Sequence, residues 1–478
     1  MLRHSLLPYA ESCTSSSPIL ELIIKWINNC RTHHPECRQL QKKENWWPTR
    51  VIDIGNEGDG KWKLVSLPAK PQPPPSYMTL SYTWGSKDNF RLLKKNLYSF
   101  QNGLPIADLP RTFQDASSVA WSFSVKFLWI DALCIIQDCS EDWSRESAAM
   151  RLVYTNALCN LAAVASTDPY GGLFRSRNTE DLQPSIVRAA LDKSTPPKDY
   201  YAVDSDYTNC ELLDKELLKR GWVFQERLLS PRVLYFGDKT LAAEERPTLS
   251  IAREWEELVK IYTDYKLTEA GDRLHAIEGV ADLFREVFHD TYAFGLWKTE
   301  LTRQLSYYVR SPRKEVPSHY VAPSWSWASL QSPVKFEDSS WWSDITEHVS
   351  VLDLNPTEGT LTLRGPIFIA KIDKESRYNL VTSNARLNAE IYPDRVGKQV
   401  NMPDLITLLP LISYWRSRGL GLDCLVLEPI LVTVATNYRR IAYIKFEQGQ
   451  DLAFFGMTVL ADGSTKIGKV APSVISLM

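Results

Sequence analysis

Hydrophobic and polar positions follow a helical period and then a strand period in the first 70 residues. The run PILELIIKWINNC has apolar side chains at helical spacing and predicts a short amphipathic helix, whereas RVIDIG and KWKLVSL predict two short strands. The proline-rich segment 68–76 suits neither a helix nor a central strand. Residues 1–70 are therefore expected to form a lead-in region that ends at a domain boundary.

From Tyr77 onward, apolar runs of strand length alternate with amphipathic stretches of helical length. The expected order is strand, helix, strand, helix and strand, carried by YMTLSYTW, residues 110–123, KFLWIDALCII, residues 140–158 and CNLAAVAS. Strands that are apolar throughout are buried on both faces, which is typical of a parallel sheet covered by helices. Residues 71–237 therefore predict an α/β domain with a mainly parallel sheet and helices on both faces.

The pattern changes again in the remainder of the chain. Residues 175–208 are polar and are expected to form an irregular surface insertion. After them, LLDKELLKRGW predicts a helix that stops near Gly221, VFQERLLS a short helix and RVLYF a strand. Residues 238–330 predict a helical extension packed on the α/β domain, with APSWSWASL as a strand. Short apolar runs over residues 331–478 predict a separate β-rich domain.

Composition narrows the classes of partner. The chain has 478 residues, of which 44% are hydrophobic and 23% charged, and these are ordinary values for a folded globular protein. Its formal net charge of −2 provides no broad positive field, so we expect no nucleic-acid partner. There is no apolar run long enough to cross a bilayer and no secretory signal in MLRHSLLPYAESC, so we expect no membrane partner and a cytoplasmic location. In that compartment all eight cysteines are expected to be free thiols.

Candidate ligand-binding residues lie where the predicted strands end, because ligands of parallel sheets bind beyond the carboxyl ends of the strands. These residues are Ser81, Tyr82, Trp84, Gly85 and Asp131. Gly85 allows the backbone to turn, and Trp84 either stacks on a flat ring or packs in the core. Asp131 either contacts a ligand or caps the backbone that follows it.

Glu146 is the strongest candidate for chemistry. In the predicted helix after Ser140, the side chains of Trp143, Met150 and Tyr154 share one apolar stripe, and Glu146 lies at its edge. A carboxylate in that position either pairs with a cation, for example Arg220, or has a raised pKa that serves a function.

A second set of candidate residues surrounds Gly221 in the sequence. Arg220, Trp222, Gln225 and Glu226 bring a guanidinium, an indole, an amide and a carboxyl to one short segment. Arg220 either clamps a phosphate or holds an acidic side chain of the protein in a structural network.

Several other chemistries are disfavoured. Cys134 lies in an apolar run and predicts a buried, inert thiol. Cys30, His34 and Cys37 have helical spacing, but no second ligand pair accompanies them, so no metal and no resident cofactor are predicted. The chain lacks G-x-G-x-x-G, a P-loop, G-x-S-x-G and H-E-x-x-H, which argues against a dinucleotide fingerprint, an ATP site and an ordinary hydrolase.

Several blocks over about a third of the chain resemble the HET (heterokaryon incompatibility) domain of fungal proteins. They are SYTWG, LPRTFQDA, FLWIDALCIIQD, the segment from Asp142 to Ala157, the turn Gly171-Gly172-Leu173 and RGWVFQERLLSPRVL. The resemblance implies a role in fungal non-self recognition and programmed cell death, with self-association or an incompatibility partner protein.

HET domains are distantly similar to TIR domains, some of which cleave NAD with one glutamate on a helix. Trp143-x-x-Glu146 resembles the signature of that helix. The resemblance implies a TIR/Rossmann-like fold and NAD glycohydrolase activity, with NAD as a substrate, Glu146 as the catalytic residue and Trp84 or Tyr82 stacking on a ring. The alternative is a non-enzymatic signalling or scaffold module that acts by self-association or partner binding. The two differ in whether Glu146, Asp131 and Tyr82 line one pocket.

Overall fold

The computed structural model describes residues 11–34, 46–66, 75–85, 90–179, 185–189, 198–202, 212, 214–239, 241–245, 254–313, 319–337, 342–373, 379–381, 386–387, 389–395, 402–417, 419–430, 437–447, 452–468 and 470–478. The chain divides into two compact units. Unit 1 comprises residues 1–249 and 275–280, and unit 2 comprises residues 250–274 and 281–478.

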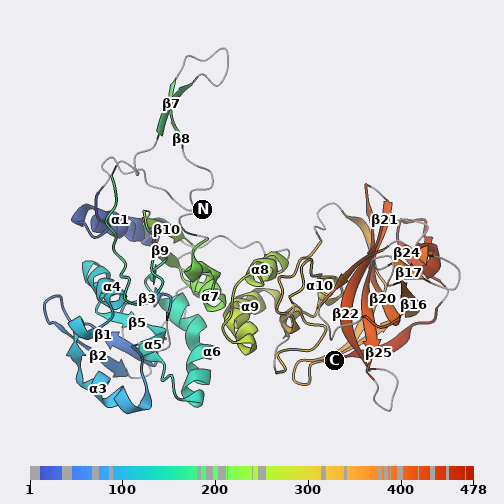
Figure 1. Cartoon of the computed structure of the whole chain (residues 1–478), viewed down its shortest axis with the longest axis horizontal. Helices are drawn as coiled ribbons and strands as arrows, with labels where there is room; N and C mark the ends of the chain where they lie inside the picture. Colours follow the sequence, from blue (N-terminus) through green and yellow to red (C-terminus); the bar gives the residue numbers. More distant parts are fainter. Residues whose placement is uncertain are drawn as a thin grey trace. The chain divides into compact units, whose positions relative to one another are not determined.

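Unit 1 is built on a mixed β-sheet whose eight strands follow the order β10-β9-β6-β3-β5-β1-β2-β4 (Figure 1). The strands are β1 (Arg50–Asp53), β2 (Lys61–Ser66), β3 (Tyr77–Ser81), β4 (Leu104–Pro105), β5 (Phe127–Trp129), β6 (Asn160–Ala162), β9 (Arg232–Phe236) and β10 (Leu241–Glu245). The four central strands β9, β6, β3 and β5 run parallel to one another. The outer strands pair antiparallel.

The prediction of a mainly parallel sheet is therefore correct only for the four strands at the centre of the sheet. The expected lead-in supplies β1 and β2, which pair with each other and join the sheet through an antiparallel contact between β1 and β5. At the other edge, β10 folds back on β9. Antiparallel neighbours need only a short turn, so these nearby segments extend the sheet without a crossover helix.

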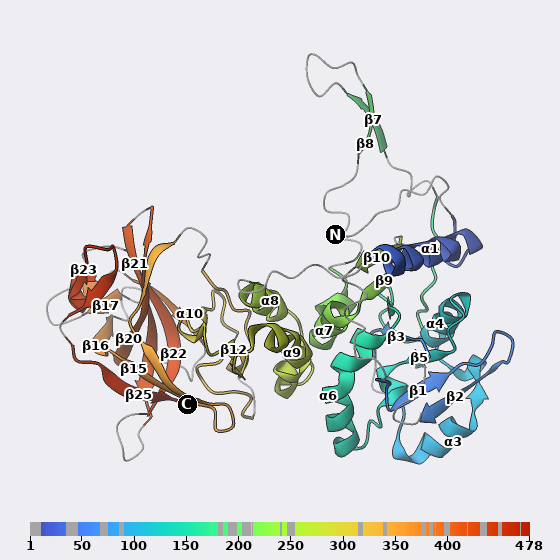
Figure 2. The same ribbon diagram turned by 180° about the vertical axis from the view of Figure 1, so that it is seen from behind.

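Helices cover both faces of this sheet, as Figures 1 and 2 show. They are α1 (Ser17–His33), α3 (Leu97–Asn102), α4 (Arg111–Ser122), α5 (Asp131–Cys134), α6 (Ser140–Asn156) and α7 (Gly221–Leu229). The Tyr77 hydroxyl donates to the Val153 carbonyl of α6, whereas the Tyr82 ring packs on Phe113 of α4. Because side chains alternate along a strand, α6 and α4 lie on opposite faces. All five residues of β3 are buried, as the apolar run predicts.

Three local expectations are wrong. The predicted strand KFLWIDALCII ends at Trp129 and continues as helix α5, in which Asp131 is the first helical residue and its carboxylate accepts a hydrogen bond from the Ala132 amide at 2.7 Å. The polar segment 175–208 contains the hairpin β7 (Ser185–Ala189) and β8 (Lys198–Ala202). Gly221 begins α7 instead of ending a helix, and only a 3₁₀ turn, Glu216–Lys219, precedes it.

Unit 2 begins with helical segments and continues as the β-rich region that the sequence predicts. Its helices are α8 (Glu254–Tyr262), α9 (His275–Phe288, which starts in unit 1) and α10 (Leu301–Gln304). Its strands are β11 (Tyr292–Ala293), β12 (Leu296–Trp297), β13 (Ser343–Glu347), β14 (Ser350–Asn355), β15 (Thr360–Gly365), β16 (Phe368–Asp373), β17 (Asn379–Val381), β18 (Arg386–Leu387), β19 (Glu390–Pro393), β20 (Leu405–Arg416), β21 (Gly419–Pro429), β22 (Asn437–Phe446), β23 (Met457–Val459), β24 (Thr465–Ile467) and β25 (Ser473–Leu477). The predicted strand APSWSWASL instead forms a 3₁₀ turn, Trp327–Ser329, and both Trp325 and Trp327 are fully buried.

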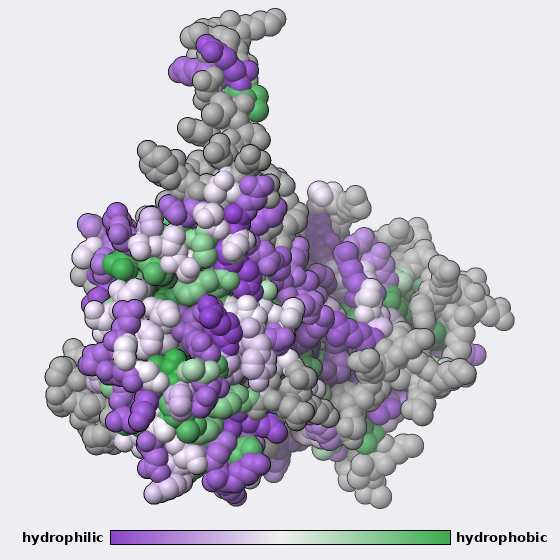
Figure 3. Space-filling model, turned by 60° about the vertical axis from the view of Figure 1, so that its left-hand side comes forward, coloured by the Kyte–Doolittle hydropathy of each residue, from purple (hydrophilic) through white to green (hydrophobic). Residues whose placement is uncertain are grey.

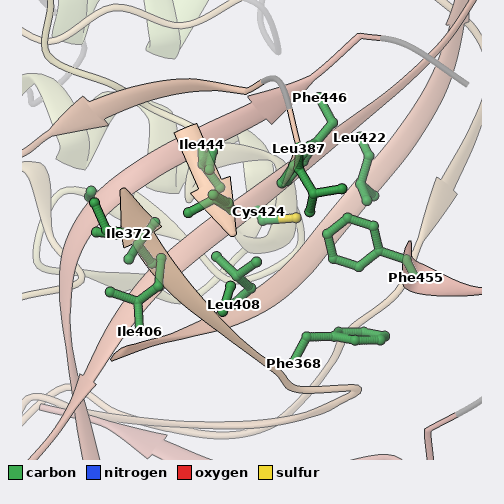
Figure 4. Packing of buried hydrophobic residues seen from close by; sticks show 14 of the residues in the cluster. Phe368, Ile372, Leu387, Ile406, Leu408, Leu422, Cys424, Ile444, Phe446 and Phe455 are labelled. Carbon is green, nitrogen blue, oxygen red and sulfur yellow. The ribbon is translucent and has the colours of Figure 1, made fainter. Parts of the chain in front are cut away.

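The large sheet of unit 2 has eleven strands and is antiparallel except where β22 meets β25. One of its faces carries an apolar core, and Figure 4 shows these side chains converging between the strands. Leu408 of β20, Cys424 of β21 and Ile444 of β22 are each fully buried there. Long neighbouring strands with apolar inward-facing residues explain why this region folds as a β unit.

The surface and the cysteines agree with the composition. Hydrophilic residues dominate the face of the molecule in Figure 3, with small hydrophobic areas between them. No helix within the described ranges is both long and apolar enough to cross a bilayer. Six cysteines are described and all are free, and Cys134 is buried as predicted. Cys37 and Cys210 lie outside the described residues.

Candidate functional site

A buried polar cluster lies at the carboxyl end of β3, between the sheet and helices α6 and α7. The Ser81 hydroxyl donates a short hydrogen bond to the Glu226 carboxyl of α7. The side chain of Asn160, on the adjacent strand β6, donates to the Ser81 hydroxyl at 2.9 Å and accepts from the Thr79 hydroxyl at 3.0 Å. The parallel register places Thr79 opposite Asn160, so these polar groups meet on one face of the sheet.

Glu226 has the most informative electrostatics of the cluster. Its side chain is nearly inaccessible to solvent, and desolvation is the largest influence on its pKa, followed by the nearby carboxyl of Asp131. Desolvation and the Asp131 carboxyl both favour the protonated, neutral form of Glu226. The Ser81 hydroxyl, the Arg220 guanidinium and the Tyr154 hydroxyl act in the opposite direction, and the result is a pKa raised to about 7.

Asp131 connects this cluster to the aromatic residues at the strand end. Its carboxylate accepts a hydrogen bond from the Trp84 indole nitrogen at 2.8 Å. Burial raises its pKa, while the hydrogen bond from Trp84 and the charge of Arg220 oppose that shift. The Arg220 guanidinium donates to the Tyr82 carbonyl at 2.7 Å, which joins the start of α7 to the end of β3. Burial, and then the Asp131 charge, raise the pKa of the Tyr82 hydroxyl.

Gly85 is required by the turn that follows β3. Its φ of +71° lies in the left-handed region, which a side chain disfavours. A Cβ placed there would also approach the Cβ of Asp168 to 2.8 Å. The glycine therefore has a steric role.

Glu146 lies in a different cluster, formed by two acids and two arginines. The Arg50 guanidinium contacts Asp142 at 2.5 Å and Glu146 at 3.6 Å, and the exposed Arg145 reaches both carboxylates, with a distance of 3.1 Å to Glu146. Glu146 is buried, as its place on the helix edge predicts. The interpretation as an ion pair finds its cations in Arg50 and Arg145, not in Arg220.

Short helix α5 lies between the two clusters. Arg50 donates to the Cys134 carbonyl at 2.7 Å at the carboxyl end of α5, and Asp131 stands at the amino end. Burial raises the pKa of the Cys134 thiol to about 12, and this agrees with the inert thiol that the sequence predicts.

The remaining candidates are placed outside these clusters. The Trp143 ring meets the Trp222 ring edge-on, with centroids 6.2 Å apart, at the junction of α6 and α7. The Gln225 side chain accepts a hydrogen bond from the Gly279 amide at 3.2 Å. Both contacts join elements of unit 1.

Sequence reasoning missed Arg50, Asp142, Asn160 and Tyr154 as members of the two clusters. Asn160 carries a usable signal, because a polar side chain in an otherwise apolar strand needs a partner. Arg50 has no such signal in the sequence, since its role depends on β1 joining the sheet. Within the described residues no group of three His, Cys, Asp or Glu side chains could hold a metal, and Cys37 of the candidate zinc triad lies outside them.

In the cluster at the end of β3, the Glu226 carboxyl can hold a proton and lies beside the Ser81 hydroxyl and near the Arg220 guanidinium. A carboxyl whose pKa is close to 7 can donate or accept a proton at neutral pH. The second cluster offers a carboxylate held between two cations. The structure brings Ser81, Tyr82, Trp84, Asp131, Arg220 and Glu226 together and leaves Glu146 apart from them.

Comparison with known proteins confirms the predicted family resemblance. Residues 77–226 match the family model described as Heterokaryon incompatibility protein (HET). The match extends from the first residue of β3 to Glu226 and includes both clusters except Arg50. No curated protein and no solved structure gives a significant match to the chain. The chain therefore carries a HET domain, and this domain indicates a function of the heterokaryon incompatibility type.

Proposed function

We propose, from the HET domain that this chain carries, that the protein is an effector of fungal non-self recognition which arrests growth or kills the cell when it is activated. The observation that carries the proposal is the match over residues 77–226, which coincides with the central strands and the helices of one α/β unit. The polar cluster lies inside this matched segment, so the function is assigned to unit 1.

The proposed activity is hydrolysis of the bond between nicotinamide and ribose in NAD. In this reaction the glycosidic bond breaks, water adds to the ribose carbon, and nicotinamide and ADP-ribose are released. The positive charge that develops on the ribose is stabilised by a nearby carboxylate. Two carboxyl groups are candidates for the reaction: Glu146, which the family resemblance favours for charge stabilisation, and Glu226, whose raised pKa favours proton transfer.

Glu226 suits proton transfer better than Glu146 does. Its pKa of about 7 allows it to take a proton from the attacking water near neutral pH. Glu146 already faces the guanidinium groups of Arg50 and Arg145, which compete with any developing positive charge. The chemistry therefore supports Glu226 as the general base, whereas the role of Glu146 in charge stabilisation rests on the family resemblance alone.

The second candidate function is a non-enzymatic module that acts by self-association or partner binding. It is supported by the separation of Glu146 from the cluster of Tyr82 and Asp131, because a TIR-like catalytic site would bring these groups together. In that case both clusters stabilise the fold and the surface of unit 1 carries the function.

NAD turnover by the purified full chain separates the two candidates. We expect the wild type to release nicotinamide, and Glu226→Gln to reduce the rate by about a hundredfold or more while the fold is retained, since general acid–base catalysis contributes roughly 10²–10⁴-fold. Glu146→Gln should also abolish turnover if Glu146 stabilises the developing charge, and Glu141→Gln is its matched control, because Glu141 is an exposed carboxylate on the same helix. Absence of turnover in the wild type at any protein concentration contradicts the enzymatic proposal and favours the scaffold.

Induced expression in a fungal host tests the effector role itself. Wild-type protein is expected to arrest growth, and variants that lose NAD turnover are expected to lose this effect. Growth arrest by an inactive variant favours the scaffold, whereas normal growth with abundant folded wild-type protein contradicts the effector proposal.

A further inference from the structure

A cleft of about 470 Å³ opens on unit 1, apart from both clusters described above. It is bordered by the segment before α1, by α1 itself, by α4 and by residues 174–176. Sites for small molecules in proteins typically measure roughly 300–1,000 Å³, so the cleft is of suitable size.

The floor of the cleft is rigidly built. Asp115 of α4 is 4% exposed and accepts a hydrogen bond from the Leu173 amide at 2.8 Å. Gly172 lets the chain approach this closely, since its φ is +75° and a Cβ there would meet the Asp115 carboxylate at 2.7 Å. Arg175 donates to the carbonyl oxygens of Gly171 and Gly172, which fixes the same turn. These contacts preform the cleft before any ligand arrives.

Arg111 supplies a cation at the rim. Its Nε atom pairs with Asp115 at 2.9 Å, which orients the guanidinium plane, and its side chain is 63% exposed. The two terminal nitrogens make no hydrogen bond to any residue that the structure describes. Such a fork of N–H groups matches the oxygens of a phosphate or a carboxylate.

The charges and the apolar wall define the class of ligand. Arg111 and Arg175 against Asp115 give the lining a net charge of +1, from two cations and one anion. Leu20 of α1 and Phe174 present apolar surface in the same cleft. An aromatic ring such as Phe174 favours contact with a flat group.

We propose that this cleft binds a small molecule that joins a phosphate or carboxylate group to a flat apolar body. Arg111 binds the anionic group, and Leu20 and Phe174 contact the apolar body. Asp115 positions Arg111 and does not contact the ligand. The site is distinct from the Glu226 cluster.

Cys13 provides a direct readout of occupancy. Its thiol lies in the cleft, 3.0 Å from the Ser15 hydroxyl, and hydrogen bonds to Ser15 lower its pKa. Cys30, Cys134 and Cys159, the other described cysteines of this part of the chain apart from Cys139, are buried. A bound ligand should slow the alkylation of Cys13 by iodoacetamide, measured on its own peptide by mass spectrometry.

The test measures binding of phenyl phosphate and of benzoate to the full chain by calorimetry and by protection of Cys13. We expect one of the two to bind and protect, which also identifies the anionic group, and phenol to do neither. Arg111→Gln should weaken binding by about tenfold or more because a charge-assisted hydrogen bond is lost. Leu20→Gln should weaken ligand binding several-fold, because it removes apolar contact with the ligand. Arg31→Gln should leave the affinity unchanged, because Arg31 is an exposed residue of α1 outside the lining of the cleft.

Two results would overturn the proposal. One is the absence of both heat and protection with either probe at about 10 mM, a concentration at which even weak specific sites are occupied. The other is unchanged affinity in a folded Arg111→Gln protein, because the anion would then bind elsewhere. Because Arg111 pairs with the buried Asp115, the melting temperature of Arg111→Gln is measured beside its affinity; Asp115 keeps its hydrogen bonds from the Leu173 and Phe174 amides in this variant.

Discussion

Replacing Glu226 with glutamine should change how the stability of unit 1 depends on pH. Glutamine has nearly the same size and cannot ionise, so the substitution removes one titration and little volume. In the folded protein the pKa of Glu226 is about 7, whereas its ordinary value is 4.5. Between these two values the folded protein holds a proton that the unfolded chain has released.

The direction of the effect follows from this difference in bound protons. Below pH 4.5 both states are protonated and the full contribution to stability is present. As pH rises toward 7, that contribution is progressively lost, because the unfolded chain releases its proton while the buried acid beside Asp131 keeps it. Above pH 7 both states are ionised and the loss is complete. Each unit of pKa difference corresponds to about 1.4 kcal/mol, so the wild type should lose roughly 3 kcal/mol relative to Glu226→Gln across this window.

Urea unfolding at a series of pH values from 5 to 8 measures this difference. Unfolding of unit 1 can be followed separately from unit 2 by the labelling of Cys134 and Cys159, which are buried in the folded protein, with a disulfide reagent that reacts in mild acid. The informative quantity is the free energy of unfolding of the wild type minus that of Glu226→Gln. A constant offset from the altered hydrogen bond to Ser81 does not affect its slope.

A difference that stays constant from pH 5 to 8 would refute the reasoning, since it would mean that Glu226 has the same pKa in both states. Glu57→Gln is the control for a general effect of charge, because Glu57 is an exposed carboxylate of unit 1. Its profile should run parallel to that of the wild type.

Two further predictions concern stability. Arg50→Met should lower the free energy of unfolding of unit 1 by roughly 1–3 kcal/mol, because Asp142 and Glu146 lose their buried cation and keep only the exposed Arg145; a loss below about 1 kcal/mol in urea unfolding would contradict this. Gly421→Ala should destabilise unit 2 by about 1–3 kcal/mol, since the new Cβ would meet the Tyr414 ring at 2.5 Å, whereas Gly468→Ala has its nearest neighbour at 3.6 Å; equal melting temperatures for the two variants would show that the ring moves freely.

The local patterns of the chain were sufficient to predict most elements of unit 1. The apolar runs at β3, β5, β6 and β9 are buried strands, and the amphipathic stretches are helices α1, α4 and α6. These elements form because the period of apolar side chains matches the geometry of one kind of backbone. The family resemblance was also visible in the sequence, because its blocks lie inside these same elements.

The errors occur where a polar contact or a distant segment decides the structure. The chain enters α5 at Asp131, whose carboxylate accepts hydrogen bonds from the Ala132 amide and from the distant Trp84 indole, although the surrounding residues predict a strand. The alternation in APSWSWASL predicts a strand, but the indoles of Trp325 and Trp327 donate to the carbonyls of Gly359 and Gly295, and these contacts favour a tight turn.

The candidate site was likewise predicted only in part from the sequence. The sequence by itself identified Asp131 at a strand end and Arg220 and Glu226 in a polar set around Gly221, and it placed Glu146 on the apolar edge of its helix. Only the tertiary structure decided which acids share an environment, because β1 carries Arg50 to Asp142 and Glu146, while the parallel pairing of β3 with β6 brings Asn160 to Ser81. A pKa depends on burial and on charges within a few ångströms, and those distances are set by packing between segments far apart in the chain.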